Sequence, residues 1–135
     1  MDYLNEASVL ITETNIPNKE NLAREAFRVT KAGGYFAAAD WLISHDSEPS
    51  KEMADYISAE DLDFEMASPA RYKSAKEEAG FTNVALTSRN TWYYRVALKE
   101  LARFSGPERV GWDKKFGRTF MKDQENIWKK LVNVL

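Results

Sequence analysis

The stretch from Pro17 to Trp41 has the pattern of an amphipathic helix, a tight turn and a buried strand. Asn18 is a suitable N-cap, because its side-chain oxygen can accept hydrogen bonds from the free amides of a first helical turn. The apolar residues that follow recur at helical spacing and share one stripe: Leu22, Ala26 and Val29, with Ala23 and Phe27 beside them. Gly33 and Gly34 are predicted to end the helix, since glycine takes positive φ without a Cβ clash.

The five residues after this turn, Tyr35 to Ala39, are all apolar. A strand that does not alternate between apolar and polar residues is typical of a parallel sheet covered by helices on both faces. Asp40 and Trp41 come directly after this strand. Ligands of open α/β sheets bind at the carboxyl ends of the strands, so these two residues are candidates for a site.

Two further strands are expected. The first covers residues 1–5, with a second possibility at Ser8 to Thr12, and the other covers residues 82–88. Together with Tyr35 to Ala39 they predict an α/β fold containing a partial Rossmann-like sheet of three strands.

Helices are expected before and after the predicted strand at residues 82–88. Asp46 or Ser47 can cap a helix opened by Pro49, and Ser68-Pro69 is a strong start for a helix that ends at Gly80. Between these two helices, Glu60 to Glu65 alternates acidic and apolar residues, as a lid over a pocket would. The last third is predicted to be helical, with helices from Thr91 to Phe104, Glu108 to Phe116 and Met121 to Leu135.

The totals are those of an ordinary globular chain. With 135 residues, 44% hydrophobic and 30% charged, the chain is expected to form a single domain over residues 1–135. It has no cysteine, which excludes disulfides, thiolate metal sites and cysteine nucleophiles, and we expect a cytoplasmic location. No metal-binding constellation stands out. No apolar run approaches the ~20 residues that span a membrane.

Charge is unevenly placed along the chain. Residues 1–88 hold 8 basic and 16 acidic side chains, a net charge of −8, whereas residues 89–135 hold 11 basic and 5 acidic ones, a net charge of +6. Two solvated faces that attract each other would explain this, and so would an acidic lid over a cationic substrate. The basic residues are spread along helices rather than clustered, so we expect no nucleic-acid partner, and we expect no membrane partner.

The order of residues from Arg24 to Trp41, REAFRVTKAGGYFAAADW, resembles a segment of class I S-adenosylmethionine-dependent methyltransferases. In that family the segment forms the helix before the fifth strand, the turn, and that strand. Residues 1–8 are similar to the family's fourth strand, and residues 81–87 to its sixth. The resemblance implies that Asn5 and Glu6 touch the cofactor, S-adenosylmethionine.

The family binds this cofactor mainly through an N-terminal half with a glycine-rich loop. The glycines here stand at positions 33, 34, 80, 106, 111 and 117 and form no G-x-G pattern. The first three strands and the seventh are also missing. We therefore expect the C-terminal half of a methyltransferase-like domain, inactive as an isolated chain, whose N-terminal half is missing or replaced by a partner.

Methyltransferases of small amines, the phosphoethanolamine and sarcosine/dimethylglycine types, are the most similar within that family. Pro49 to Tyr56 is similar to their P-S-x-E-x-x-x-Y helix. The phosphate-binding arginine and tyrosine of that type fall here on Glu60 and Leu62. A carboxylate suits an ammonium group rather than a phosphate, so a small cationic or amine acceptor is expected.

The candidate site residues follow from these likenesses. Asp40 is the candidate catalytic residue, which would orient or deprotonate the acceptor. Four residues are candidates for binding the acceptor: Trp41, which could stack on a cation, and Tyr56, Glu60 and His45. Four of them have a structural alternative: a loop carboxylate for Asp40, a core wall for Trp41, a core-facing helix residue for Tyr56, and an incidental loop histidine for His45.

A second function class is a non-catalytic module. Bare strand edges are templates for association with another chain. On this interpretation the chain forms a homo-oligomer through its sheet, or docks on a partner through its basic helices.

Overall fold

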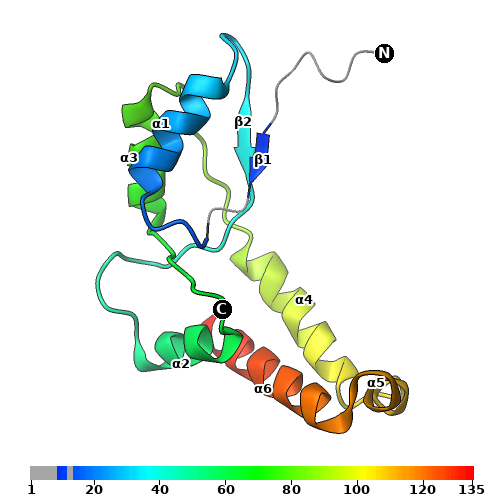
Figure 1. The fold of residues 1–135 in the computed structure, drawn as a ribbon. Coiled ribbons are helices and arrows are strands. Elements are labelled where there is room, and N and C mark those ends of the chain that lie inside the picture. Colours follow the sequence, from blue (N-terminus) through cyan, green and yellow to red (C-terminus); the bar gives the residue numbers. More distant parts are fainter. Residues whose placement is uncertain (1–8, 12–13) are drawn as a thin grey trace, which may run out of the picture. The chain divides into compact units, whose positions relative to one another are not determined.

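The computed structural model describes residues 9–11 and 14–135 (Figure 1). The elements follow one another as β1 (Val9–Ile11), α1 (Lys19–Val29), β2 (Phe36–Ala38), α2 (Lys51–Glu60), α3 (Pro69–Ala79), α4 (Asn90–Arg103), α5 (Arg109–Phe116) and α6 (Arg118–Val134). Among these described residues, no helix has the length and apolar character needed to cross a membrane.

The described part of the chain divides into two compact units. The first combines the residues up to Glu48 with Leu62–Leu86, and the second combines Pro49–Asp61 with Thr87–Leu135. The expectation that the whole chain behaves as a single domain stays a prediction.

The first unit contains β1, β2, α1 and α3. The two strands pair in parallel, with Val9 opposite Phe36 and Ile11 opposite Ala38, and α1 packs against α3 (Figure 1). Asn18 caps α1 as expected, accepting a hydrogen bond from the Asn21 amide at 2.8 Å.

The helix α3 has the start and end that the sequence indicates. The Ser68 hydroxyl accepts from the Arg71 amide at 3.1 Å, and Gly80 ends the helix at φ +113°. A hydrogen bond of 3.1 Å from the Phe81 amide to the Lys76 carbonyl closes the last turn.

The buried stripe of α1 is not the one that we expected. Lys19, Ala23 and Ala26 are buried, whereas the side chains of Phe27 and Val29 are 44% and 54% exposed. Two of these buried residues are alanines, and α1 packs against α3. Phe27 instead packs edge-on against Phe81, with 5.1 Å between ring centroids.

The predicted three-stranded α/β sheet is wrong. The described residues are mostly helical, and strand pairing is limited to three residues on each side. The predicted strand at residues 82–88 is absent, and Asn83 has φ +57°, which interrupts an extended chain.

The strand β2 is present but is not covered on both faces. Phe36 is half-buried, and Ala37 and Ala38 are exposed. An alanine gains little from burial, so this apolar run does not force helices onto both sides. The strand expected at residues 1–5 lies outside the described residues, and β1 falls within the alternative, Ser8 to Thr12.

The second unit is helical. The central helix α6 contacts α2, α4 and α5, and the buried apolar side chains are Tyr56, Ala97, Met121 and Leu131. The helix α2 is capped by Ser50, whose hydroxyl accepts from the Met53 amide at 3.2 Å, rather than by Asp46 or Ser47.

Polar contacts also tie these helices together. The Arg109 guanidinium on α5 binds Asp113 at 2.6 Å and Glu125 of α6 at 2.8 Å. The Trp128 indole of α6 donates to Glu100 of α4 at 3.1 Å. The helices of this unit are therefore fixed by both apolar and charged contacts.

Candidate functional site

Asp40 lies two residues beyond the end of β2, and several groups hold its carboxylate. One oxygen, Oδ1, accepts from the Thr14 hydroxyl and from the Trp41 amide, the latter at 2.9 Å. The Tyr72 hydroxyl lies 3.4 Å from Oδ2. We call Thr14, Asp40, Trp41 and Tyr72 the Asp40 cluster. These contacts come from three separate parts of the chain and fix the direction of the carboxylate.

Two members of this cluster are buried, and one is also held by a backbone hydrogen bond. Thr14 is 1% exposed and Tyr72 is 5% exposed. The Thr14 carbonyl accepts from the Glu65 amide at 2.8 Å, which joins the cluster to the segment before α3. The cluster is therefore built into the packing of the first unit.

A buried lysine lies next to the cluster. Lys76 is one turn beyond Tyr72 on α3 and is 4% exposed. Its ammonium lies 4.2 Å from the centre of the Tyr72 ring and 5.1 Å from that of Phe36. Such cation–π contacts stabilise a charge that has left water. Tyr72 thus contacts Asp40 through its hydroxyl and Lys76 through its ring.

Trp41 and His45 follow Asp40 in the chain but differ in their surroundings. Trp41 is half-buried, and its amide contacts Asp40. His45 is exposed, and its Nδ1 lies 2.8 Å from the Ser47 hydroxyl. The structure therefore brings Asp40 and Trp41 into one cluster and places His45 in the exposed segment beyond it.

Asp46, next to His45, has a structural role. Its carboxylate accepts from the Ser68 amide at 2.8 Å and from the Ser68 hydroxyl at 2.6 Å. These two hydrogen bonds hold the pKa of Asp46 below its ordinary value. Asp46 therefore fixes the cap of α3 rather than that of α2.

Tyr56 and Glu60 belong to the second unit. Tyr56 is 3% exposed, and burial raises its pKa far above the ordinary value, with a further contribution from its hydrogen bond to Glu60. Burial likewise raises the pKa of Tyr93. This environment agrees with the core-facing alternative for Tyr56, and Glu60 serves there as its hydrogen-bond partner.

The two candidate cofactor residues, Asn5 and Glu6, lie outside the described residues. Three residues of the site were not among the candidates, namely Thr14, Tyr72 and Lys76. The sequence gives a weak indication that Tyr72 and Lys76 lie together, because residues four apart share one side of a helix. It gives no such indication for Thr14, since Thr14 meets Asp40 only through the tertiary fold.

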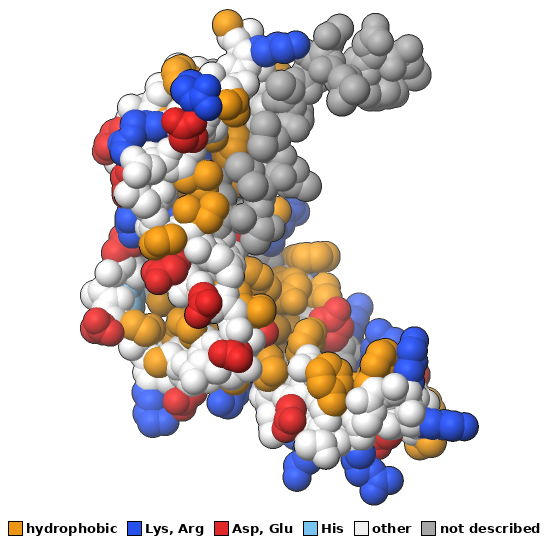
Figure 2. All heavy atoms as spheres, in the orientation of Figure 1, with side chains coloured by type: hydrophobic (Ala, Val, Ile, Leu, Met, Phe, Trp, Pro, Cys, Tyr) orange, Lys and Arg blue, Asp and Glu red, His pale blue; other side chains and the backbone are white. Residues whose placement is uncertain are grey.

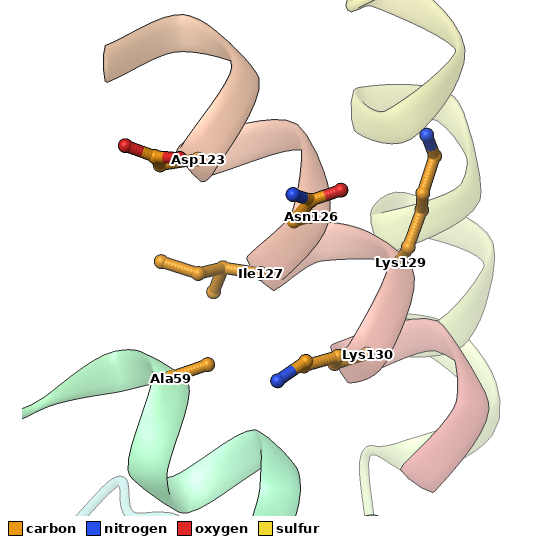
Figure 3. A pocket seen from close by; sticks show the side chains of 6 residues that line it. All are labelled: Ala59, Asp123, Asn126, Ile127, Lys129 and Lys130. Carbon is orange, nitrogen blue, oxygen red and sulfur yellow. The ribbon is translucent and has the colours of Figure 1, made fainter. Parts of the chain in front are cut away.

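The second unit also has an open pocket of about 390 Å³ between α2 and α6. Figure 3 shows Ala59 facing Ile127 and Lys130 across it. The Lys130 ammonium donates to the Asp55 carbonyl at 3.0 Å. Of the candidate site residues that the structure describes, none lines this pocket. Within residues 9–11 and 14–135, no group of His, Asp or Glu side chains is arranged to hold a metal ion.

Comparison with known proteins adds no family assignment. The chain matches no family model, and it matches none of the curated proteins with which it was compared.

Proposed function

We propose that this chain binds a small cationic or amine acceptor at the Asp40 cluster, as the acceptor-binding part of an S-adenosylmethionine-dependent methyltransferase. The observation that carries this proposal is the held carboxylate of Asp40, two residues beyond β2, with the indole of Trp41 on the next residue. A fixed carboxylate suits an ammonium group by charge, and an indole on the next residue can offer cation–π contact.

Positioning is the main requirement of such a reaction. In-line methyl transfer to an amine gains most of its acceleration from holding the reacting groups in the right geometry. A carboxylate fixed by Thr14, Tyr72 and the Trp41 amide supports a role in orienting the acceptor. Tyr56 is buried in the core of the second unit and does not offer a surface to an acceptor. We therefore assign acceptor binding to Asp40 and Trp41.

The described residues do not fit the cofactor. A cofactor loop follows a strand and leads into a helix, with glycines that let the backbone approach the ligand. Here Gly33 and Gly34 follow a helix and lead into β2, and the Gly33 turn at φ +77° ends α1. We therefore assign no step to the cofactor and expect the isolated chain to be inactive. Any cofactor contact would come from Asn5 and Glu6 or from another chain.

Acceptor binding can be tested directly by calorimetric titration of the chain with sarcosine, dimethylglycine and ethanolamine. We expect one of these amines to bind and Asp40→Asn to weaken its binding about 10-fold or more, because hydrogen bonds to charged groups contribute ~1.5–3 kcal/mol. Asp46→Asn is the matched control, since it removes a held carboxylate of the same unit that lies outside the cluster. Equal affinity in Asp40→Asn and the original chain would refute the assignment.

A separate titration with S-adenosylmethionine tests the cofactor argument. We expect no micromolar binding to the isolated chain. Binding at that strength would show that the chain builds its own cofactor site and would contradict the argument from glycine placement.

A non-catalytic, self-associating module is the second candidate. The observation in its favour is the exposed surface at β2, where Ala37 and Ala38 are exposed and Tyr35, just before the strand, is 68% exposed. Light scattering at low micromolar concentration measures this directly. A dimeric or larger species that becomes monomeric in Tyr35→Lys supports association through β2, and a 15.5 kDa species in the original chain contradicts it.

A further inference from the structure

The helices α5 and α6 meet at a corner with an unusual surface. Gly117 forms the corner at φ +93°. Basic and phenyl side chains lie on both sides of this glycine: Lys114, Lys115, Phe116, Arg118, Phe120 and Lys122. We call these six residues the corner patch.

The two phenyl rings of the corner patch are adjacent and open to solvent. Phe116 and Phe120 are each 51% exposed, and their ring centroids are 6.4 Å apart. The Lys115 ammonium lies 5.0 Å from the centre of the Phe116 ring. Two neighbouring phenyl groups held half in water form a small apolar surface on which a partner could pack.

Basic side chains outnumber acidic ones around these rings; Arg118 lies 3.7 Å from Asp113, and Asp123 follows Lys122 directly. Residues 114–122 contain four basic side chains and no acidic one. The nearest preceding carboxylate, Asp113, is held by Arg109 at 2.6 Å. Figure 2 shows basic side chains projecting from the end of the helical unit where α5 and α6 meet (lower right). The corner patch therefore combines a positive field with exposed rings.

We propose that the corner patch docks on the surface of an anionic lipid membrane. Basic side chains are attracted to acidic headgroups, and neighbouring apolar rings enter the boundary between headgroups and acyl chains. The sequence alone indicated no membrane partner because no apolar run is long enough to span a bilayer. That criterion excludes spanning helices and does not bear on surface binding.

A nucleic acid is the other polyanion that such a surface could meet. Proteins that bind single strands align basic groups along a groove and stack successive bases on aromatic rings. Here the basic side chains flank one pair of rings at a helix corner, a geometry that favours insertion into an interface. The lipid surface is therefore the occupant to which we commit.

The test is co-sedimentation of the full chain with vesicles of phosphatidylcholine, with and without phosphatidylserine. We expect binding to the vesicles that contain phosphatidylserine, and weaker binding at high salt, where screening shortens the reach of charge. Lys114→Gln with Lys115→Gln should lower the partition roughly 25-fold, since one basic side chain near the surface contributes roughly fivefold. Phe116→Ala with Phe120→Ala should abolish the part of the binding that persists at high salt.

Matched controls keep the charge and the apolar content of the variants comparable. Lys31→Gln with Lys73→Gln removes two exposed lysines elsewhere, and Val29→Ala with Leu62→Ala removes two exposed apolar side chains elsewhere. Both control variants should bind as the original chain does. Circular dichroism checks that each variant is folded. If the double phenylalanine variant does not fold, the double lysine variant still tests the proposal.

Three results would overturn the proposal. They are equal binding to neutral and anionic vesicles, equal loss in the control variants, and displacement from vesicles by a single-stranded oligonucleotide that binds more tightly through the same residues. The last result would make the corner patch a nucleic-acid surface.

Discussion

Gly80→Ala tests the packing of the first unit most sharply. Gly80 has φ +113°, and a Cβ added there would lie 2.7 Å from Cζ of Phe27. The substitution has two separate costs. Holding a non-glycine residue in this backbone region costs about 1–3 kcal/mol, and displacing the Phe27 ring adds about 1–3 kcal/mol of overpacking.

The two costs separate in a double-mutant cycle with Phe27→Ala. A phenylalanine buried on a sheet would cost about 3–5 kcal/mol when truncated. Phe27 is 44% exposed, so we expect roughly half of that cost, about 2 kcal/mol. Once the ring is gone, Gly80→Ala keeps only its backbone cost. The double variant should therefore be about 1–3 kcal/mol more stable than the sum of the single losses.

Urea unfolding gives the free energies, and hydrogen exchange of the α1 and α3 amides reports on the first unit by itself. Gly33→Ala is the matched control in the same unit, because it has φ +77° and nothing lies within 4 Å of its added Cβ. The contact between Phe27 and the end of α3 is refuted by either of two results. One is a loss of unfolding free energy for Gly80→Ala no larger than for Gly33→Ala, and the other is a loss that is unchanged without the Phe27 ring.

Three further predictions concern stability. Leu131→Ala, at a site 2% exposed in α6, should cost about 2–5 kcal/mol in urea unfolding, and a loss below about 1 kcal/mol would place α6 at the surface. Gly111→Ala, with open space around the added Cβ within α5, should stabilise that helix by about 0.5–1 kcal/mol, and a lower melting temperature would contradict this. Arg71 holds the pKa of Glu20 at about 2, below its ordinary 4.5. The stabilisation from this pair is therefore complete above pH 4.5 and is lost as the pH falls toward 2. Its size is at most ~1 kcal/mol because both side chains are more than a third exposed. Glu20→Gln should flatten the acid limb of stability measured between these pH values, and an unchanged limb would contradict the assignment.

Local signals predicted local structure well in this chain. The caps at Asn18 and Ser68 and the glycine at the end of α3 are where the sequence indicated them. Each depends on residues within four positions of one another, so tertiary contacts are not needed to find it.

The sequence missed one local feature and two that depend on distant partners. The predicted strand at residues 82–88 is absent, and Asn83 there has φ +57°. The helix α1 buries Lys19, Ala23 and Ala26 and packs against α3, a contact that the sequence of α1 alone does not reveal. The support of Asp40 by Thr14 spans 26 positions. Periodicity within one segment contains no information about such contacts.

The resemblance to methyltransferases now depends on one local segment and no longer on a shared sheet. The helix, glycine turn, short strand and following aspartate are present as a local unit, from α1 through Gly33 and β2 to Asp40. The sheet that would carry this unit in that family is not.

The packing of the first unit and the proposed acceptor site can be tested separately. If the coupling between Gly80 and Phe27 is measured but no amine binds at Asp40, the packing of the first unit holds and the proposed function fails. If an amine binds and Asp40→Asn abolishes its binding, the acceptor site does not require the sheet. In that case Thr14 and Tyr72, from segments far from Asp40 in sequence, provide the support that neighbouring strands would otherwise give.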